Sequence, residues 1–171
     1  MSSNLPKLKI KLTKYQQRLI TLGWLIIAIN FIIVGISYTN LPDIIPAHFN
    51  YKGEVDGFGT KSTIWTFPIL SSIIYFILYL VIKNINLWNM NYPIKVTDEN
   101  ALEIYKTSLK MLVYINVLIA IIATPIIIEI ILQAHDINLG FKFSSLSIVT
   151  VISITIIPFF YIFKMYKTPK K

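Results

Sequence analysis

Four apolar runs dominate the sequence and constrain its fold more than any other feature. They cover 19–38, 64–82, 111–133 and 144–163. An α-helix needs about 20 apolar residues to cross roughly 30 Å of hydrocarbon, and lipid offers its backbone no other hydrogen-bond partners. The chain is 55% apolar and only 14% charged, whereas soluble proteins average roughly 45–50% and about 25%. The sequence therefore predicts an all-α membrane protein with four transmembrane helices, in one membrane domain over 19–163.

Lysine and arginine are divided unequally between the two sides of the predicted bundle. Of the 16, all but Lys52, Lys61 and Lys142 lie in the N-terminal arm, in the connection between the second and third spans, or in the C-terminal tail. Because basic segments stay in the cytoplasm, we predict a multi-pass plasma-membrane protein with both termini cytoplasmic. The basic arm is 1–18, the basic tail is 164–171, and the structured loop over 39–63 is extracellular.

The net charge of +8 is thus interpreted as a topology signal. The expected partner is the lipid bilayer and not nucleic acid, because a basic nucleic-acid patch normally comes with a soluble fold and stacking aromatics. We interpret the alternating stretch at 7–12, KLKIKL, as a disordered basic arm on anionic lipid; a protein-docking arm is the alternative. Thr97 is the predicted N-cap of a helix that starts at Asp98 and continues into the third span.

The segment Leu41–Lys61 contains the polar residues that membrane packing does not explain. Pro42 and Pro46 favour extended backbone around them. In an extended segment, His48 and Asn50 share one face. Turn signals follow, with Gly53 in the first and Gly57 and Gly59 in the second. We predict a small hairpin-like cap over the outer ends of the helices, which brings Asp56 back toward His48.

Within the spans, a few polar residues interrupt the apolar pattern, and three of them stand out. Asn30 and Asn116 are predicted to make hydrogen bonds between helices. Glu129 lies about one turn below the outer surface, and an acid at membrane depth suggests function. It is placed to meet Lys61, Lys142 or His48 from beneath the loop.

Four interpretations of the loop remain open. In the first, Asp43 caps a turn, Asp56 forms an Asx-turn and His48 is a structural polar residue. The second is a divalent metal site, for example for zinc, on His48, Asp56 and Glu129, with Asp43 and His135 as further candidates. The third is catalysis with His48 as general base, although no GxSxG or HExxH motif is present and the absence of cysteine excludes thiol chemistry. The fourth is a surface that recognises an extracellular peptide or protein.

The loop also carries a recognisable pattern. Between two spans, it is Leu41-Pro42-Asp43-x-Ile45-Pro46-x-His48-Phe49-Asn50-x-x-Gly53-x-x-Asp56-Gly57-x-Gly59-x-Lys61. This resembles the domain of unknown function in bacterial SdpI-type membrane proteins, which are related to an immunity factor against a secreted toxin. The resemblance implies protection from a secreted toxin peptide outside the cell, with signalling through a regulator protein held inside.

From the residues and the resemblance together, we expect a protein without enzymatic activity or cofactor that recognises a secreted peptide or another ligand. Its candidate site consists of Pro42, Asp43, Pro46, His48, Asn50, Gly53, Asp56, Gly57, Gly59 and Lys61 in the loop, with Glu129 beneath them. The alternative is a metal-binding membrane protein or membrane hydrolase with its site at His48, Asp56 and Glu129.

Overall fold

The computed structural model describes residues 5–50 and 54–168, most of which form four long helices. In chain order, these are α1 (Lys14–Tyr38), α2 (Thr66–Asn84), α3 (Ala101–Ala134) and α4 (Ser144–Tyr166). Short 3₁₀ turns precede and follow α2, as η1 (Lys61–Trp65) and η2 (Leu87–Asn89). All four long helices are long and apolar enough to cross a membrane. The predicted all-α membrane fold with four spanning helices is therefore confirmed.

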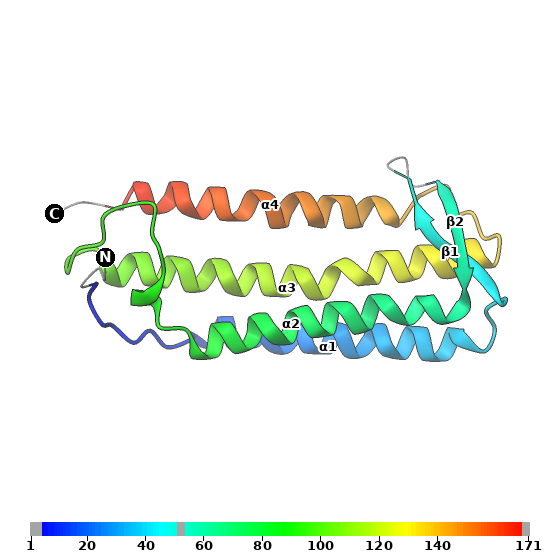
Figure 1. Ribbon diagram of the computed structural model, residues 1–171, viewed down its shortest axis with the longest axis horizontal. Helices are drawn as coiled ribbons and strands as arrows, with labels where there is room; N and C mark the ends of the chain where they lie inside the picture. Colours follow the sequence, from blue (N-terminus) through cyan, green and yellow to red (C-terminus); the bar gives the residue numbers. More distant parts are fainter. Residues whose placement is uncertain (1–4, 51–53, 169–171) are drawn as a thin grey trace.

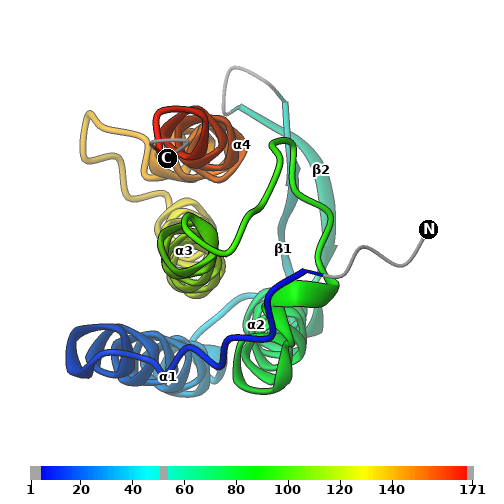
Figure 2. The same ribbon diagram turned by 90° about the vertical axis from the view of Figure 1, so that its left-hand side faces the viewer.

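Helix α3 is the central element of the bundle. It packs against each of the other three long helices. In the end-on view, it lies between α4 on one side and the pair α1 and α2 on the other (Figure 2). It has 34 residues, or about 51 Å at 1.5 Å per residue, so it exceeds the roughly 30 Å of a hydrocarbon core. Its ends are therefore long enough to reach polar material on both sides of the bilayer.

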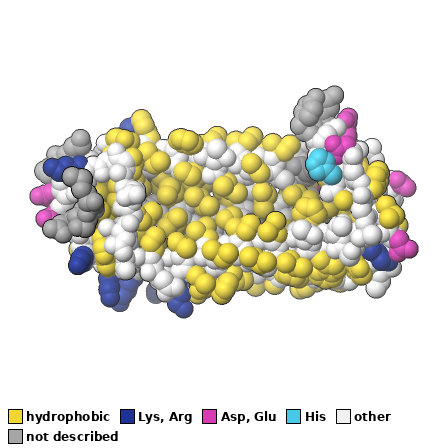
Figure 3. All heavy atoms as spheres, viewed as in Figure 1, with side chains coloured by type: hydrophobic (Ala, Val, Ile, Leu, Met, Phe, Trp, Pro, Cys, Tyr) yellow, Lys and Arg dark blue, Asp and Glu magenta, His cyan; other side chains and the backbone are white. Residues whose placement is uncertain are grey.

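The outer faces of the bundle are apolar. Helices α1, α2 and α4 expose large hydrophobic side chains such as Ile36, Ile77 and Phe159. On the face drawn in Figure 3, hydrophobic side chains cover the middle, and Lys and Arg gather mostly at the end that carries the termini. In water, an apolar surface of this size would drive the protein to associate with other molecules. In a bilayer, the same surface contacts lipid and can stay uncovered by protein. The surface is thus that of a helical bundle in a bilayer.

A β-hairpin and a long loop close the two ends of the bundle (Figure 1). The hairpin connects α1 to α2, and the loop over 85–100 connects α2 to α3. Trp88, Tyr92 and Val96 of that loop pack against a buried cluster that includes Ile104, Tyr105 and others at the start of α3. The end with the termini therefore has a packed cover of its own.

Two sequence expectations at the end with the termini are wrong. Over the described residues 5–13, the arm packs on the bundle and is not disordered: the Tyr105 hydroxyl donates to the Pro6 carbonyl (3.1 Å), and Ile10 and Leu12 pack against the buried cluster. Packing of these alternate, half-buried side chains holds the arm against the bundle. The third helix starts at Ala101 and not at Asp98.

Asn100 takes the place expected of Thr97. Its side chain accepts from the Thr97 backbone N–H (2.8 Å) and donates to the Lys95 carbonyl (3.2 Å). These two bonds hold residues 97–100 in a turn before the helix. The sequence pattern placed the cap one turn too early, because Thr97 also has the side chain of a typical cap.

The two asparagines inside the spans behave differently. Asn30 of α1 donates to the Ala120 carbonyl (3.5 Å) and accepts from the Thr124 hydroxyl (2.9 Å), both on α3. This confirms the predicted bond between helices. Asn116 is fully buried, but neither of its side-chain polar atoms has a partner among the described residues. The prediction for Asn116 is wrong, since its neighbours on the same buried side of α3 include Val113 and Val117, which are apolar.

Candidate functional site

The loop between α1 and α2 is a two-stranded hairpin. Strands β1 (Ile44–Phe49) and β2 (Val55–Thr60) pair antiparallel, with irregular register around His48. At the tip, the Asn50 N–H donates to the Glu54 carbonyl (2.9 Å). The hairpin predicted from the turn residues is therefore present. The predicted site residue Gly53 lies outside the described residues.

Apolar residues of the motif attach the hairpin to the bundle. Leu41 and Ile45 are buried in a cluster with Val34 of α1, Ile64 of η1, and Ala123, Ile127 and Ile130 of α3. Pro46 is buried beside them in the chain, whereas Pro42 is exposed. Burial of a Leu or Ile side chain stabilises a fold by about 1.5–3 kcal/mol where it leaves water. Leu41 and the consecutive buried residues Ile45 and Pro46 thus hold the hairpin on the helices.

Gly57 and Gly59 allow the two strands to approach closely. A Cβ atom at Gly57 would lie 2.9 Å from the His48 Cβ, and one at Gly59 would lie 3.1 Å from the Ala47 Cβ. Both distances are shorter than ordinary contacts between carbon atoms. Close packing of the strands therefore explains why both of these motif positions are glycine, and no ligand is needed to explain it.

Asp43 and Lys61 connect the two ends of the hairpin. The Lys61 N–H donates to the Asp43 carbonyl (2.9 Å), and the Lys61 ammonium lies 3.1 Å from the Asp43 carboxylate. The same ammonium lies 5.6 Å from the centre of the Tyr38 ring, in a cation–π contact. Lys61 therefore holds the base of the hairpin and does not turn toward Glu129.

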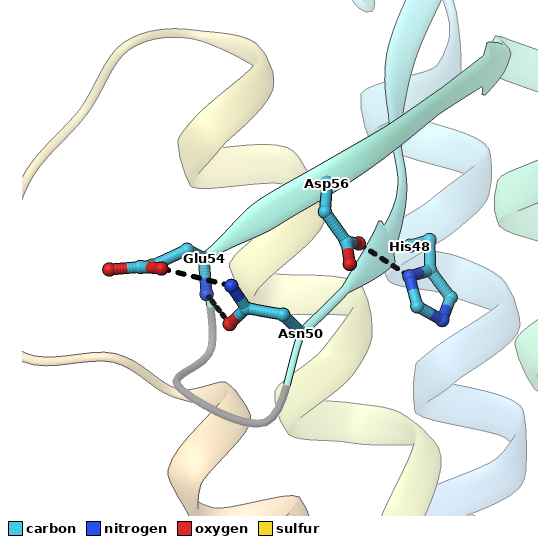
Figure 4. A network of polar contacts seen from close by, with 4 residues as sticks. All are labelled: His48, Asn50, Glu54 and Asp56. Carbon is cyan, nitrogen blue, oxygen red and sulfur yellow. Dashed lines mark hydrogen bonds and ion pairs between the residues drawn. The ribbon is translucent and has the colours of Figure 1, made fainter.

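The exposed polar residues of the hairpin form two separate pairs (Figure 4). His48 Nδ1 contacts a carboxylate oxygen of Asp56, and these side chains are 73% and 43% exposed. At the tip, Asn50 donates from its amide to Glu54 (2.9 Å) and accepts from the Glu54 N–H (3.0 Å). The sequence prediction that Asp56 returns to His48 is confirmed. Glu54 was not singled out from the sequence.

A polar pocket lies between the hairpin tip, the end of α3 and the loop before α4. Its volume is about 380 Å³, and its lining includes Glu54, Glu129, Gln133, Asp136 and Lys142. Glu129 is only 4% exposed, and one of its oxygens accepts from the Gln133 amide (2.5 Å). Glu129, which was predicted to lie beneath the loop, therefore forms part of the wall of this pocket. The hairpin residue that lines the same pocket is Glu54 and not His48.

The three predicted metal ligands do not form one cluster. Over residues 5–50 and 54–168, no three His, Asp or Glu side chains are placed to share a metal ion. His48 and Asp56 are a pair of ligand type at the exposed surface, and Glu129 belongs to the pocket. His135 is exposed beyond the end of α3. The metal site stays a prediction, with two of its three residues brought together.

Comparison with known families locates the hairpin in a recognised segment. Residues 25–71 match the family model of a domain of unknown function, DUF1648. The match runs from the middle of α1 through the whole hairpin to the start of α2. No curated protein and no solved structure matches the chain.

The matched segment, 25–71, contributes one described residue to the lining of the pocket. Glu54 lies within it, whereas Glu129, Asp136 and Lys142 are contributed by later parts of the chain. Sequence reasoning missed the pocket because its walls are about 80 residues apart. One signal was available: five of the eight acidic residues lie on the hairpin side, and these are Asp43, Glu54, Asp56, Glu129 and Asp136.

Proposed function

We propose that this multi-pass membrane protein recognises a secreted peptide at its hairpin end, as an immunity or signalling protein of the SdpI type. The observation that carries the proposal is the pocket between Glu54, Glu129 and the loop before α4, with a buried carboxylate in its wall. Recognition needs a shaped pocket and a few fixed polar groups. The lysine asymmetry of the chain supports an extracellular position for this end.

The charge of the pocket selects a cationic ligand. Its described lining contains the carboxylates of Glu54, Glu129 and Asp136 and a single lysine, Lys142. A carboxylate in a partly enclosed site binds an ammonium or guanidinium group more strongly than one in open water does. We therefore infer that the pocket receives a lysine or arginine side chain, or the free N-terminus, of the peptide.

The test is a binding and protection experiment on the full chain. Cells sensitive to a panel of secreted cationic peptides are grown with and without the protein, and a labelled peptide that is neutralised by the wild type is titrated onto the purified protein. The double variant Glu54→Gln and Glu129→Gln should weaken peptide binding about tenfold or more, since hydrogen bonds to charged groups contribute about 1.5–3 kcal/mol. Protection should fall in parallel.

Glu103→Gln is the matched control, because Glu103 is an exposed acid at the opposite end of the bundle, in the first turn of α3. It should bind and protect as the wild type does. The double variant and the Glu103→Gln control both keep the size of the side chains. The circular dichroism spectrum and the melting temperature of each should therefore match those of the wild type. Wild-type protein that protects against no peptide of the panel, or a double variant that protects fully, would contradict the proposal.

A further inference from the structure

The end of the bundle that carries the termini holds a second pocket, formed where the ordered arm meets α1 and α3. Its volume is about 240 Å³, and its lining consists of Ile10, Lys11, Thr13, Tyr15, Gln16, Lys106, Leu109 and Lys110. Three segments thus contribute: the arm, the first residues of α1, and one face of α3. The proposed peptide site is at the other end of the molecule, so this pocket requires a separate explanation.

The local structure makes the pocket a fixed feature. Thr13 and Gln16 form a capping box, in which the Thr13 N–H donates to Gln16 Oε1 (2.8 Å) and the Gln16 N–H donates to Thr13 Oγ1 (3.2 Å). Ile10 and Leu12 are packed against the buried cluster at the start of α3. Lys11 lies between Ile10 and Leu12 in the chain. Its position beside α3 is therefore set by the fold.

The charge of the pocket is uniformly positive. Lys11, Lys106 and Lys110 line it, and no acidic residue is among its described lining. None of these lysines takes part in an ion pair among the described residues; Lys110 makes a cation–π contact with Tyr114, at 5.7 Å from the ring centre. Lys106 and Lys110 are four residues apart on one helix face, where like charges destabilise a helix by about 0.2–0.5 kcal/mol. An anion between the lysines removes that repulsion.

Polar groups suited to an anion accompany the lysines. Gln16 is only 7% exposed and lines the pocket. The hydrogen bonds of its side chain within the described chain use Oε1, so its Nε2 amide group remains a donor. The Thr13 hydroxyl lines the same pocket but donates to Gln16 Oε1 (3.1 Å), and the Tyr15 hydroxyl is hydrogen-bonded to Tyr114. A phosphate, with several acceptor oxygens, matches the Gln16 amide together with the three lysine ammonium groups.

The depth of the pocket and its apolar walls favour a lipid over a free ion. Helix α3 exceeds the hydrocarbon thickness by about 20 Å, so its first turns, with Lys106 and Lys110, lie at the level of the headgroups. Ile10, Leu109 and the Tyr15 ring supply apolar contact beside the charges. Basic pockets between membrane helices at this level are suited to anionic headgroups.

We propose that this pocket binds the phosphate-bearing headgroup of an anionic phospholipid. Lys11, Lys106 and Lys110 neutralise the phosphate, the Gln16 amide donates to it, and the acyl chains extend into the surrounding bilayer. The arm is then a specific part of a lipid site, held in place by its own packing.

The test uses the full chain purified in a neutral detergent, with phosphatidylglycerol and phosphatidylcholine as the added lipids. Phosphatidylglycerol should raise the melting temperature and give bound-lipid peaks in native mass spectrometry, whereas phosphatidylcholine should not. In the double variant Lys106→Gln and Lys110→Gln, the apparent affinity for phosphatidylglycerol should fall roughly tenfold or more. The variant Lys106→Arg with Lys110→Arg keeps the charge and should retain the effect.

Lys164→Gln with Lys167→Gln is the matched control, because these lysines lie at the same end of the bundle and do not line the pocket. It should respond to phosphatidylglycerol as the wild type does. The proposed site would be overturned if the control lost as much affinity for phosphatidylglycerol as the pocket variant, or if Lys106→Gln with Lys110→Gln lost none. The lipid effect would then be a general attraction between the basic surface and anionic lipid. Inorganic phosphate or glycerol phosphate in place of the lipid should give no shift. A shift of the same size with phosphate alone would overturn the assignment to a lipid.

Discussion

At the scale of single residues, close helix contact depends on one glycine in α1. Tyr75 of α2 is fully buried, and its hydroxyl donates to the Ile20 carbonyl of α1 (2.6 Å). A Cβ atom at Gly23 would lie 2.4 Å from that hydroxyl oxygen. Small residues let membrane helices pack closely. Here the space beside Gly23 is filled by Tyr75, whose hydroxyl is hydrogen-bonded to the backbone of α1.

Gly23→Ala should destabilise the bundle by about 1–3 kcal/mol, because it forces Tyr75 away from α1 as overpacking does. Gly35→Ala is the control, since among the described residues its Cβ would meet only Trp65, at 3.9 Å. Both changes replace a helical glycine, so the difference between them isolates packing from helix propensity. The measurement is the melting temperature in detergent. A Gly23→Ala variant as stable as Gly35→Ala would show that the helices separate at no cost.

At the scale of elements, the hairpin is held by close approach of its strands and by its buried side. Gly57→Ala places a Cβ atom 2.9 Å from the His48 Cβ, which pushes β1 and β2 apart. The expected result is backbone hydrogen exchange about tenfold or more faster in the two strands, while the helices keep their protection. Phe58→Ala is the control because Phe58 is 70% exposed; its exchange should match that of the wild type. Uniformly faster exchange in the helices as well would contradict a local role for Gly57.

The same elements show how far the sequence predicts this fold. The four helices follow from apolar length alone, since lipid leaves the backbone no alternative. The hairpin follows from proline and glycine positions, and the contact of His48 with Asp56 follows from the hairpin. By contrast, the acidic pocket joins Glu54 to residues 129–142, and no local pattern encodes that approach. The docked arm was missed for a similar reason, because alternating lysines suggest a disordered basic arm on lipid until a partner for Ile10 and Leu12 is known.

At the scale of the whole molecule, the two ends have opposite chemical character. The end with the termini carries most of the lysines and the basic pocket, whereas the hairpin end carries five of the eight acidic residues and the acidic pocket. Such asymmetry serves orientation, because positive segments resist transfer across the membrane. It also separates the two proposed ligands, with an anionic lipid at one end and a cationic peptide at the other.

Cysteine labelling tests the orientation on which the peptide proposal depends. The chain has no cysteine of its own, so Glu54→Cys and Asp98→Cys each introduce a single thiol, at the hairpin tip and before α3. In intact cells, an impermeant thiol reagent should label Glu54→Cys, and it should label Asp98→Cys only after the membrane is opened. The reverse pattern would place the acidic pocket in the cytoplasm and exclude secreted peptides as its ligands. It would leave the lipid proposal intact, because both leaflets offer phosphate headgroups and only the leaflet assigned to the basic pocket would change.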